Sequence, residues 1–177
     1  GMKKEGREYA GILYVGGMIT GSGIKIVEFN SRWGDPEAEV LIPGLKTDYL
    51  EIVESVINKK LNRLKIKTDN LVRVSIAGCS KGYPDNYSSV KGKKINGLEN
   101  INKLPNITLF GAGISKSGNN FLANGWRLFH VMAEGLTILQ ARLRAYGAIS
   151  MINISGNNLH YRTDIGWRDL ERENSWS

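Results

Sequence analysis

Three residues at alternate positions, Glu28, Asn30 and Arg32, have side-chain types that could bind a metal ion and a phosphate group. The first two lie in the segment I-K-I-V-E-F-N, in which apolar and polar residues alternate as in a β-strand. This alternation predicts that Glu28 and Asn30 share one face of the strand with Ile24 and Ile26. A carboxylate and an amide carbonyl form an all-oxygen pair, which suits a hard cation such as Mg²⁺ or Mn²⁺.

Arg32 continues the same face if the strand extends that far. Its guanidinium group would then add a planar, permanently charged fork for a phosphate or a carboxylate. Glu28 and Asn30 also have ordinary structural explanations. A Glu on an amphipathic strand is usually solvated, and an Asn at a strand end usually belongs to a turn. The pair E-x-N alone favours that ordinary explanation. The metal-site hypothesis therefore depends on the residues that follow.

The next residues, R-W-G-D-P-E-A-E at positions 32–39, make the hypothesis more specific. With the preceding E-F-N they resemble the metal-binding strand and turn of ATP-grasp ligases. In particular, they resemble the R-[LF]-G-D-P-E-x-[EQ] signature of the phosphoribosylamine–glycine ligase family, from which only Trp33 departs. Three further segments resemble motifs of this family in the same order: S-K-G-Y-P from Ser80, N-G-x-R from Asn124 and Y-R-x-D-I-G from Tyr161. Four motifs in order are a specific match, whereas one alone would be weak.

The resemblance implies an ATP-dependent ligase of purine biosynthesis that joins glycine to phosphoribosylamine through an acyl phosphate and gives glycinamide ribonucleotide. It implies that Glu28 and Asn30 hold Mg²⁺ (or Mn²⁺) beside the ATP phosphates. It also implies that Arg32 is a catalytic residue, which stabilises the transferring phosphoryl group or the acyl-phosphate oxygens.

Four further residues are candidates for substrate binding. The resemblance suggests that Asp35 and Glu37 shape the turn and can offer a carboxylate to a substrate amine. Lys81 and Arg127 are candidates for the ribose 5-phosphate because of their charge and position. A solvated loop cation explains either of these two residues equally well.

The pattern of the whole chain predicts an α+β protein of two parts. Residues 1–64 resemble the second half of an ATP-grasp domain, with an antiparallel sheet that carries the metal-binding strand, followed by helices. A polar, basic stretch around residues 62–70 predicts the boundary. Residues 65–177 correspond to the C-terminal domain of the ligase, and their short, turn-bounded strands predict a mostly antiparallel β domain. One long helix is expected there, at residues 138–152, with a capping box at its start.

Composition limits the location and the partners of the protein. The chain has 177 residues, a net charge of +7 and one cysteine, Cys79. One cysteine excludes an internal disulfide and a Cys-based metal cluster, and no apolar run has the length of a membrane span, so we expect a cytoplasmic protein without a membrane partner. The basic residues are scattered, and only 8% of residues are aromatic. This pattern favours phosphorylated metabolites or a solvated basic surface over nucleic acid.

The resemblance starts inside an ATP-grasp domain, so we expect an incomplete, C-terminal portion that is inactive alone. Its partner would be the remaining N-terminal part of the ligase, from the same gene or supplied in trans. Two alternatives stay open. Another ATP-grasp carboxylate–amine ligase or a carboxylase component would share E-x-N-x-R, although G-D-P-E and Y-R-x-D-I-G favour the first interpretation. A non-enzymatic basic binding module would instead bind nucleic acid in a salt-sensitive way.

Overall fold

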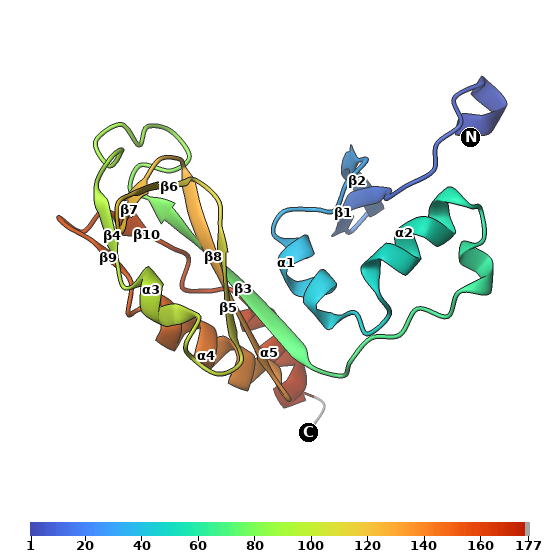
Figure 1. Ribbon diagram of the computed structural model, residues 1–177. Coiled ribbons are helices and arrows are strands. Elements are labelled where there is room, and N and C mark those ends of the chain that lie inside the picture. The colour runs from blue at the N-terminus through green and yellow to red at the C-terminus, as the bar shows by residue number, and fades with distance from the viewer. Residues whose placement is uncertain (176–177) are drawn as a thin grey trace. The chain divides into compact units, whose positions relative to one another are not determined.

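The computed structural model describes residues 1–175, with side chains to residue 172, and the chain forms two compact units (Figure 1). The first unit is Gly1–Asp69 and the second is Asn70–Ser177. The boundary predicted after residue 64 lies within the first unit. Both units contain antiparallel strands and helices, so the chain is α+β as predicted.

The first unit consists of a β-hairpin followed by short helices. Its elements are η1 (Met2–Glu5), β1 (Tyr14–Thr20), β2 (Gly23–Asn30), α1 (Glu37–Leu41), η2 (Ile42–Gly44), α2 (Tyr49–Ile57) and η3 (Leu61–Arg63). The antiparallel strands and the helices expected after them are present. Before β1 begins at Tyr14, the Tyr9 hydroxyl donates to the Ile12 carbonyl at 2.5 Å.

A β-bulge in β2 determines which side chains share a face of the hairpin. Gly16 pairs with Glu28, but Gly17 pairs with Ile26, which leaves Val27 as an extra residue in β2. An extra residue on one strand reverses the alternation of side chains on that strand. Glu28 therefore lies on the opposite face from Ile26.

The bulge corrects part of the predicted face. Ile24 and Ile26 were expected beside Glu28, and they lie on the other side of the hairpin. Beyond the bulge the register is regular and Asn30 pairs with Tyr14, so Glu28 and Asn30 do share a face. Counting at a period of two cannot detect an inserted residue, and every side chain on one side of it is then assigned to the wrong face.

Helix α2 begins as predicted but buries a different face. Asp48 caps the helix and accepts a hydrogen bond from the backbone N–H of Leu50 at 2.7 Å. The spacing of Leu50, Val53, Ile57 and Leu61 predicts that these residues form the packed face of α2. The buried residue of the helix is instead Ile52, and Leu50 and Ile57 are exposed. Ile52 is also the only buried large apolar side chain in residues 1–69. The first unit thus has very little hydrophobic core of its own.

The second unit contains two four-stranded antiparallel sheets, with the strand orders β10-β3-β8-β5 and β6-β7-β4-β9. The strands are β3 (Val72–Ser80), β4 (Lys94–Asn96), β5 (Ile107–Gly111), β6 (Ile114–Ser117), β7 (Asn120–Ala123), β8 (Arg127–Gly135), β9 (Asn153–Ile154) and β10 (Leu159–His160). The helices are α3 (Leu98–Ile101), α4 (Ile138–Ile149) and α5 (Trp167–Ser175). This arrangement confirms the predicted antiparallel domain with one long helix.

Helix α4 packs along the sheet that contains β3 and β8 and supplies much of the core (Figure 1). Thr137 caps it as predicted, and its hydroxyl oxygen accepts from the N–H of Gln140 at 3.2 Å. Ala141 and Ala145 are fully buried, and side chains of this size let a helix lie close to strands. Among the residues that the structure describes, no helix is long and apolar enough to cross a bilayer.

The core position Ile149 on α4 gives a test of this packing. Ile149→Ala is expected to lower the free energy of unfolding by about 2–5 kcal/mol, because it removes buried methylene and methyl groups and leaves a cavity. Leu143→Ala on the same helix changes a side chain that is 60% exposed, so its effect should stay within about 0.5 kcal/mol. Urea unfolding followed by circular dichroism measures both, and equal losses would contradict the packing described.

Candidate metal and phosphate sites

The polar face of the hairpin carries Tyr14, Glu28 and Asn30. Tyr14 and Asn30 are direct cross-strand partners, and Glu28 lies opposite Gly16. A Cβ on Gly16 would approach the Cγ of Glu28 to 3.1 Å, so glycine leaves room for the Glu28 side chain there. Same-face neighbours on a strand are about 7 Å apart, so one carboxylate and one amide oxygen can reach a single ion.

Tyr14 joins the hairpin to the G-D-P-E turn. Its hydroxyl donates to Glu37 Oε1 at 3.1 Å. A Cβ on Gly34 would lie 2.1 Å from Glu37 Oε2 and 3.0 Å from Tyr14 Cε2, so a larger residue at this position would displace the pair. The glycine of the motif therefore lets the turn hold its glutamate against the polar side of the hairpin.

The charges around Tyr14 raise the pKa of its hydroxyl above the ordinary value of 10.0. The largest cause is the hydrogen bond to Glu37, followed by the charge of the same carboxylate. The charge of Glu28 acts in the same direction, and the charge of Arg32 opposes it. Of these groups, Glu37 is in direct contact with the Tyr14 hydroxyl.

Arg32 does not extend the strand, because β2 ends at Asn30. The Nη1 of Arg32 donates to the carbonyl of Trp33 at 2.8 Å, and the guanidinium group is exposed. Trp33 is held in turn by a hydrogen bond of 2.9 Å from its Nε1 to the hydroxyl of Tyr49. Arg32 thus lies beside the polar face on an anchored turn, and not on the strand itself.

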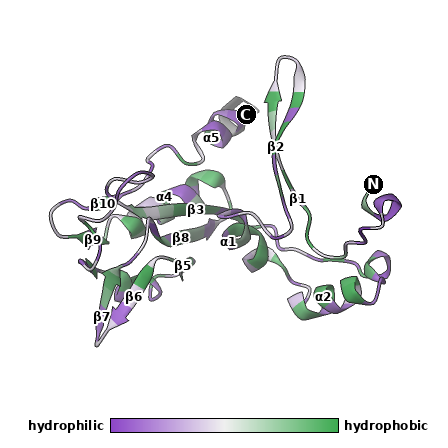
Figure 2. Cartoon of the chain, turned by 90° about the horizontal axis from the view of Figure 1, so that it is seen from above, coloured by the Kyte–Doolittle hydropathy of each residue, from purple (hydrophilic) through white to green (hydrophobic). Residues whose placement is uncertain are grey.

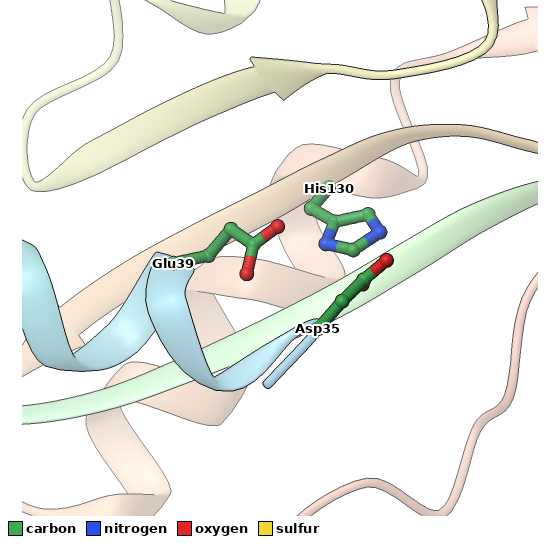
Figure 3. A group of neighbouring side chains, drawn as sticks. All are labelled: Asp35, Glu39 and His130. Atoms are coloured by element: carbon green, nitrogen blue, oxygen red, sulfur yellow. The ribbon is translucent and has the colours of Figure 1, made fainter. Parts of the chain in front are cut away.

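Asp35, the other carboxylate of the turn, is exposed. Figure 3 shows Asp35 and Glu39, which belong to the first unit, and His130, which belongs to β8 of the second unit. We assign no metal site to these three residues, because they belong to different units. The oxygen pair of Glu28 and Asn30 lies within one unit and on one face.

The second unit brings the two candidate phosphate-binding cations to the same end of the sheet that contains β3 and β8. Arg127 at the start of β8 pairs with Cys79, and Lys81 directly follows β3. Ser80 joins the two loops, because its N–H donates to the carbonyl of Trp126 and its hydroxyl donates to the carbonyl of Gly125, both at 2.8 Å. The S-K-G-Y-P and N-G-x-R segments are therefore adjacent in space.

Trp126, at the variable position of the N-G-x-R segment, does not disturb this junction. Its half-exposed ring contacts the ring of Tyr87 edge-on, with ring centres 6.0 Å apart. The close backbone approach occurs at Gly125, where a Cβ would lie 2.8 Å from the Cα of Gly113. The tight packing of this segment thus requires glycine at position 125 and tolerates an aromatic side chain at position 126.

The near-terminal Y-R-x-D-I-G segment is held by α4. Arg142 donates two hydrogen bonds of 2.8 Å to carbonyl oxygens of this segment, and Tyr146 donates to the carbonyl of Arg162 at 2.8 Å. The guanidinium of Arg162 pairs with Asp164 at 2.6 Å, and this hydrogen bond holds the pKa of the Asp164 carboxyl below its usual value. The charged groups of this motif bind each other, which indicates a structural role.

The sequence carries no signal for the connecting roles of Tyr14 and Ser80. Pairing the two strands across the Gly21–Ser22 turn without a bulge would place Tyr14 opposite Phe29, and only the bulge at Val27 places it opposite Asn30. Ser80 has no local signal either, because its partner loop is far away in the sequence. Its role follows from the pairing of β3 with β8.

The hairpin and its G-D-P-E turn belong to the ATP-grasp class. A family model described as the phosphoribosylglycinamide synthetase ATP-grasp (A) domain matches residues 1–38. A second model, described as the phosphoribosylglycinamide synthetase C domain, matches residues 73–168. The chain belongs to the phosphoribosylglycinamide synthetase family, as its four motifs predicted.

Individual relatives agree with the family models. The phosphoribosylamine–glycine ligase of Caldanaerobacter subterraneus subsp. tengcongensis is 40% identical over 164 residues, which cover 93% of this chain and 38% of that ligase. A bifunctional purine biosynthetic protein of Dictyostelium discoideum is 40% identical over 179 residues, which cover 96% of this chain and 21% of that protein. The crystal structure of phosphoribosylamine–glycine ligase from Thermotoga maritima is 30% identical, with a TM-score of 0.66, and the match covers 92% of this chain and 39% of that one. The chain thus spans about two fifths of the length of the bacterial ligases it matches.

Tyr14 is expected to lose its proton at a higher pH than a solvated tyrosine. A raised pKa in the folded state favours the neutral phenol, so its contribution to stability is complete below the unfolded pKa of about 10 and is lost as the pH rises through the folded value. The difference between ultraviolet absorbance titrations of the unmodified chain and Tyr14→Phe isolates this ionisation.

The matched variants are Glu37→Gln and Glu51→Gln. Glu37→Gln removes the charge beside the phenol and should move the Tyr14 step back toward its ordinary pKa. Glu51→Gln changes an exposed residue of α2 and should leave the step in place. An unmoved Tyr14 step in Glu37→Gln would show that this carboxylate does not cause the shift.

Proposed function

We propose that this chain is the C-terminal portion of an ATP-dependent carbon–nitrogen ligase of purine biosynthesis. The complete enzyme would join glycine to phosphoribosylamine and release glycinamide ribonucleotide, ADP and phosphate. The observation that carries the proposal is that Glu28 and Asn30 lie on one face of β2. The turn after this strand brings Glu37 to the same side, where it accepts a hydrogen bond from Tyr14. The C-domain match over residues 73–168 favours this ligase over other ATP-grasp enzymes.

The proposed reaction has two steps. The carboxylate of glycine attacks the γ-phosphoryl group of ATP, which gives an acyl phosphate and ADP. The amine of phosphoribosylamine then attacks the acyl carbon and displaces phosphate, and it loses a proton as the amide forms. Such chemistry needs positioning and charge neutralisation more than strong acids or bases.

The residues of the polar face fit these needs. Glu28 and Asn30 would hold Mg²⁺ or Mn²⁺, because their oxygens are hard ligands on one face of a strand. A bound ion would supply positive charge beside the transferring phosphoryl group. Arg32, which lies on the anchored turn next to this face, would stabilise the oxygens of the phosphoryl group or of the acyl phosphate.

Each unit carries its own candidates for substrate binding. In the first unit, Glu37 is engaged by Tyr14 and would shape the turn, and the exposed carboxylate of Asp35 is the candidate for a substrate amine. Lys81 and Arg127 would bind the ribose 5-phosphate, since they come from adjacent loops at one end of the sheet. A cytoplasmic location is part of the proposal, because a single cysteine suits a reducing compartment.

The first test is ADP release by the chain with and without the rest of a ligase. The 177-residue chain alone is expected to release no ADP above background with ATP, Mg²⁺, glycine and phosphoribosylamine. The Caldanaerobacter ligase lacking the segment that this chain matches should restore release that depends on glycine. Rapid turnover by the chain alone would contradict its incompleteness.

The restored activity allows a matched comparison of two glutamates. Glu28→Gln keeps the size of the side chain but removes the charge of a metal ligand, and it should lower the restored rate by about a hundredfold or more. Glu54→Gln is the same exchange at an exposed position of α2 and should have no effect. Equal rates for the two variants would refute the metal-ligand assignment of Glu28.

The phosphate assignment has its own test in the restored enzyme. Lys81→Met is expected to raise the KM for phosphoribosylamine by about tenfold or more and to leave the KM for glycine unchanged, because only one substrate carries the phosphate. Lys116→Met, at an exposed lysine of β6, is the control. A KM for phosphoribosylamine that stays the same in Lys81→Met would exclude Lys81 from the phosphate site.

A further inference from the structure

A second bulge, in β8, decides which face of the sheet carries the side chain of Arg127. Gly78 pairs with Phe129, whereas Cys79 pairs with Arg127, which leaves Leu128 as an extra residue in β8. An extra residue reverses the alternation of side chains on its strand. Phe129 lies over Gly78 and packs in the hydrophobic core, so Arg127 and Cys79 lie on the opposite face of the sheet.

His160 of β10 lies on the same face, on the other side of Cys79. The strand order is β10-β3-β8, and β3 and β8 are seen side by side in Figure 2. Cys79 pairs with His160 on β10 and with Arg127 on β8. Because directly paired residues have their side chains on one face, Arg127, Cys79 and His160 form a row across three strands.

The register also places Lys81 on this face. Lys81 comes two positions after Cys79, and its N–H donates to the carbonyl of Asn158 at 2.8 Å, so the pairing of β3 with β10 continues to this residue. Alternate positions along a strand share a face. Lys81 and His160 are exposed, and Arg127 is partly buried. One end of the sheet therefore presents three nitrogen-bearing side chains together.

The residue at the centre of this group adds no charge that would oppose an anion. Burial raises the pKa of the Cys79 thiol above its ordinary value, so the thiol is neutral near pH 7. Neighbouring strands are about 5 Å apart, so the backbones of Arg127 and His160 are separated by about 10 Å. Long side chains on both sides of a small, neutral residue can meet around one phosphate group.

The backbone of His160 is held on both sides along the chain. Before it, Asn158 is buried, and its carbonyl accepts the hydrogen bond from Lys81. After it, the Y-R-x-D-I-G segment is hydrogen-bonded to α4. A side chain on a backbone fixed in this way loses little conformational freedom when it binds a ligand.

We propose that His160 is a third binding residue for the phosphate group for which Lys81 and Arg127 are candidates, and that its imidazole N–H donates to a phosphate oxygen. The choice of a ribose 5-phosphate as the ligand rests on the proposed function, in which phosphoribosylamine is the substrate with a phosphate monoester. A phosphate monoester has three terminal oxygens, one for each of the three side chains.

The test follows the imidazole NMR signals of the full chain in a phosphate-free buffer while ribose 5-phosphate is added. The chain has two histidines, so the His160 signal is the one that disappears in His160→Gln. Ribose 5-phosphate should shift this signal until the site is saturated, because the phosphate binds the ring. Ribose, which lacks the phosphate, should leave the signal unchanged.

The phosphorus NMR signal of ribose 5-phosphate measures the affinity of each variant. His160→Gln should weaken binding by about tenfold, because a hydrogen bond to a charged group is lost. Lys94→Met is the control, since it removes a cation from an exposed position of β4 in the other sheet, and it should bind as tightly as the unmodified chain.

An unmoved His160 signal, or equal affinity of His160→Gln and the unmodified chain, would overturn the proposal. A larger shift of the His160 signal with ATP than with ribose 5-phosphate would assign the group to the nucleotide and would also overturn it. The measurement needs neither ATP nor the rest of a ligase. Binding of ribose 5-phosphate by a chain that restores no ligation would therefore refute the proposed function alone, and restored ligation without this binding would refute the role of His160 alone.

Discussion

The unpaired residue Val27 in β2 determines what each face of the hairpin presents. The bulge sets Glu28 and Asn30 on the side of Tyr14 and sets Ile24 and Ile26 on the other. An unbroken alternation would place the metal-ligand candidates on the same face as Ile24 and Ile26. The candidate site therefore depends on one backbone irregularity.

The second unit has a different organisation, in which a complete core supports loops that come together at one edge. Helix α4 packs its alanines on the sheet of β3 and β8, and its polar residues Arg142 and Tyr146 bind the Y-R-x-D-I-G segment. At the end of the same sheet Ser80 fastens the two loops that carry the candidate phosphate cations. A stable core allows this unit to hold loops without a partner, whereas the first unit buries almost none of its apolar residues.

Signals that act within a few residues were sufficient to predict most elements. The Thr137 cap and the spacing of the buried alanines predicted α4, and Asp48 predicted the start of α2, since capping and helical periodicity are local. The four motifs predicted the family, which the two domain models confirmed. The packing face of α2 was wrong, because hydrophobic spacing shows which residues are apolar and not whether a neighbouring layer exists to cover them.

The sequence by itself determined the residue types, the family and the order of the elements. Only the tertiary structure decided which side chains are neighbours: the Tyr14–Glu37 hydrogen bond, the junction of Lys81 and Arg127 at the end of β3 and β8, and the reversal at Val27. The physical reason is that strand register is fixed by pairing between distant segments and by bulges. A shift of one residue leaves the local pattern unchanged but exchanges the two faces.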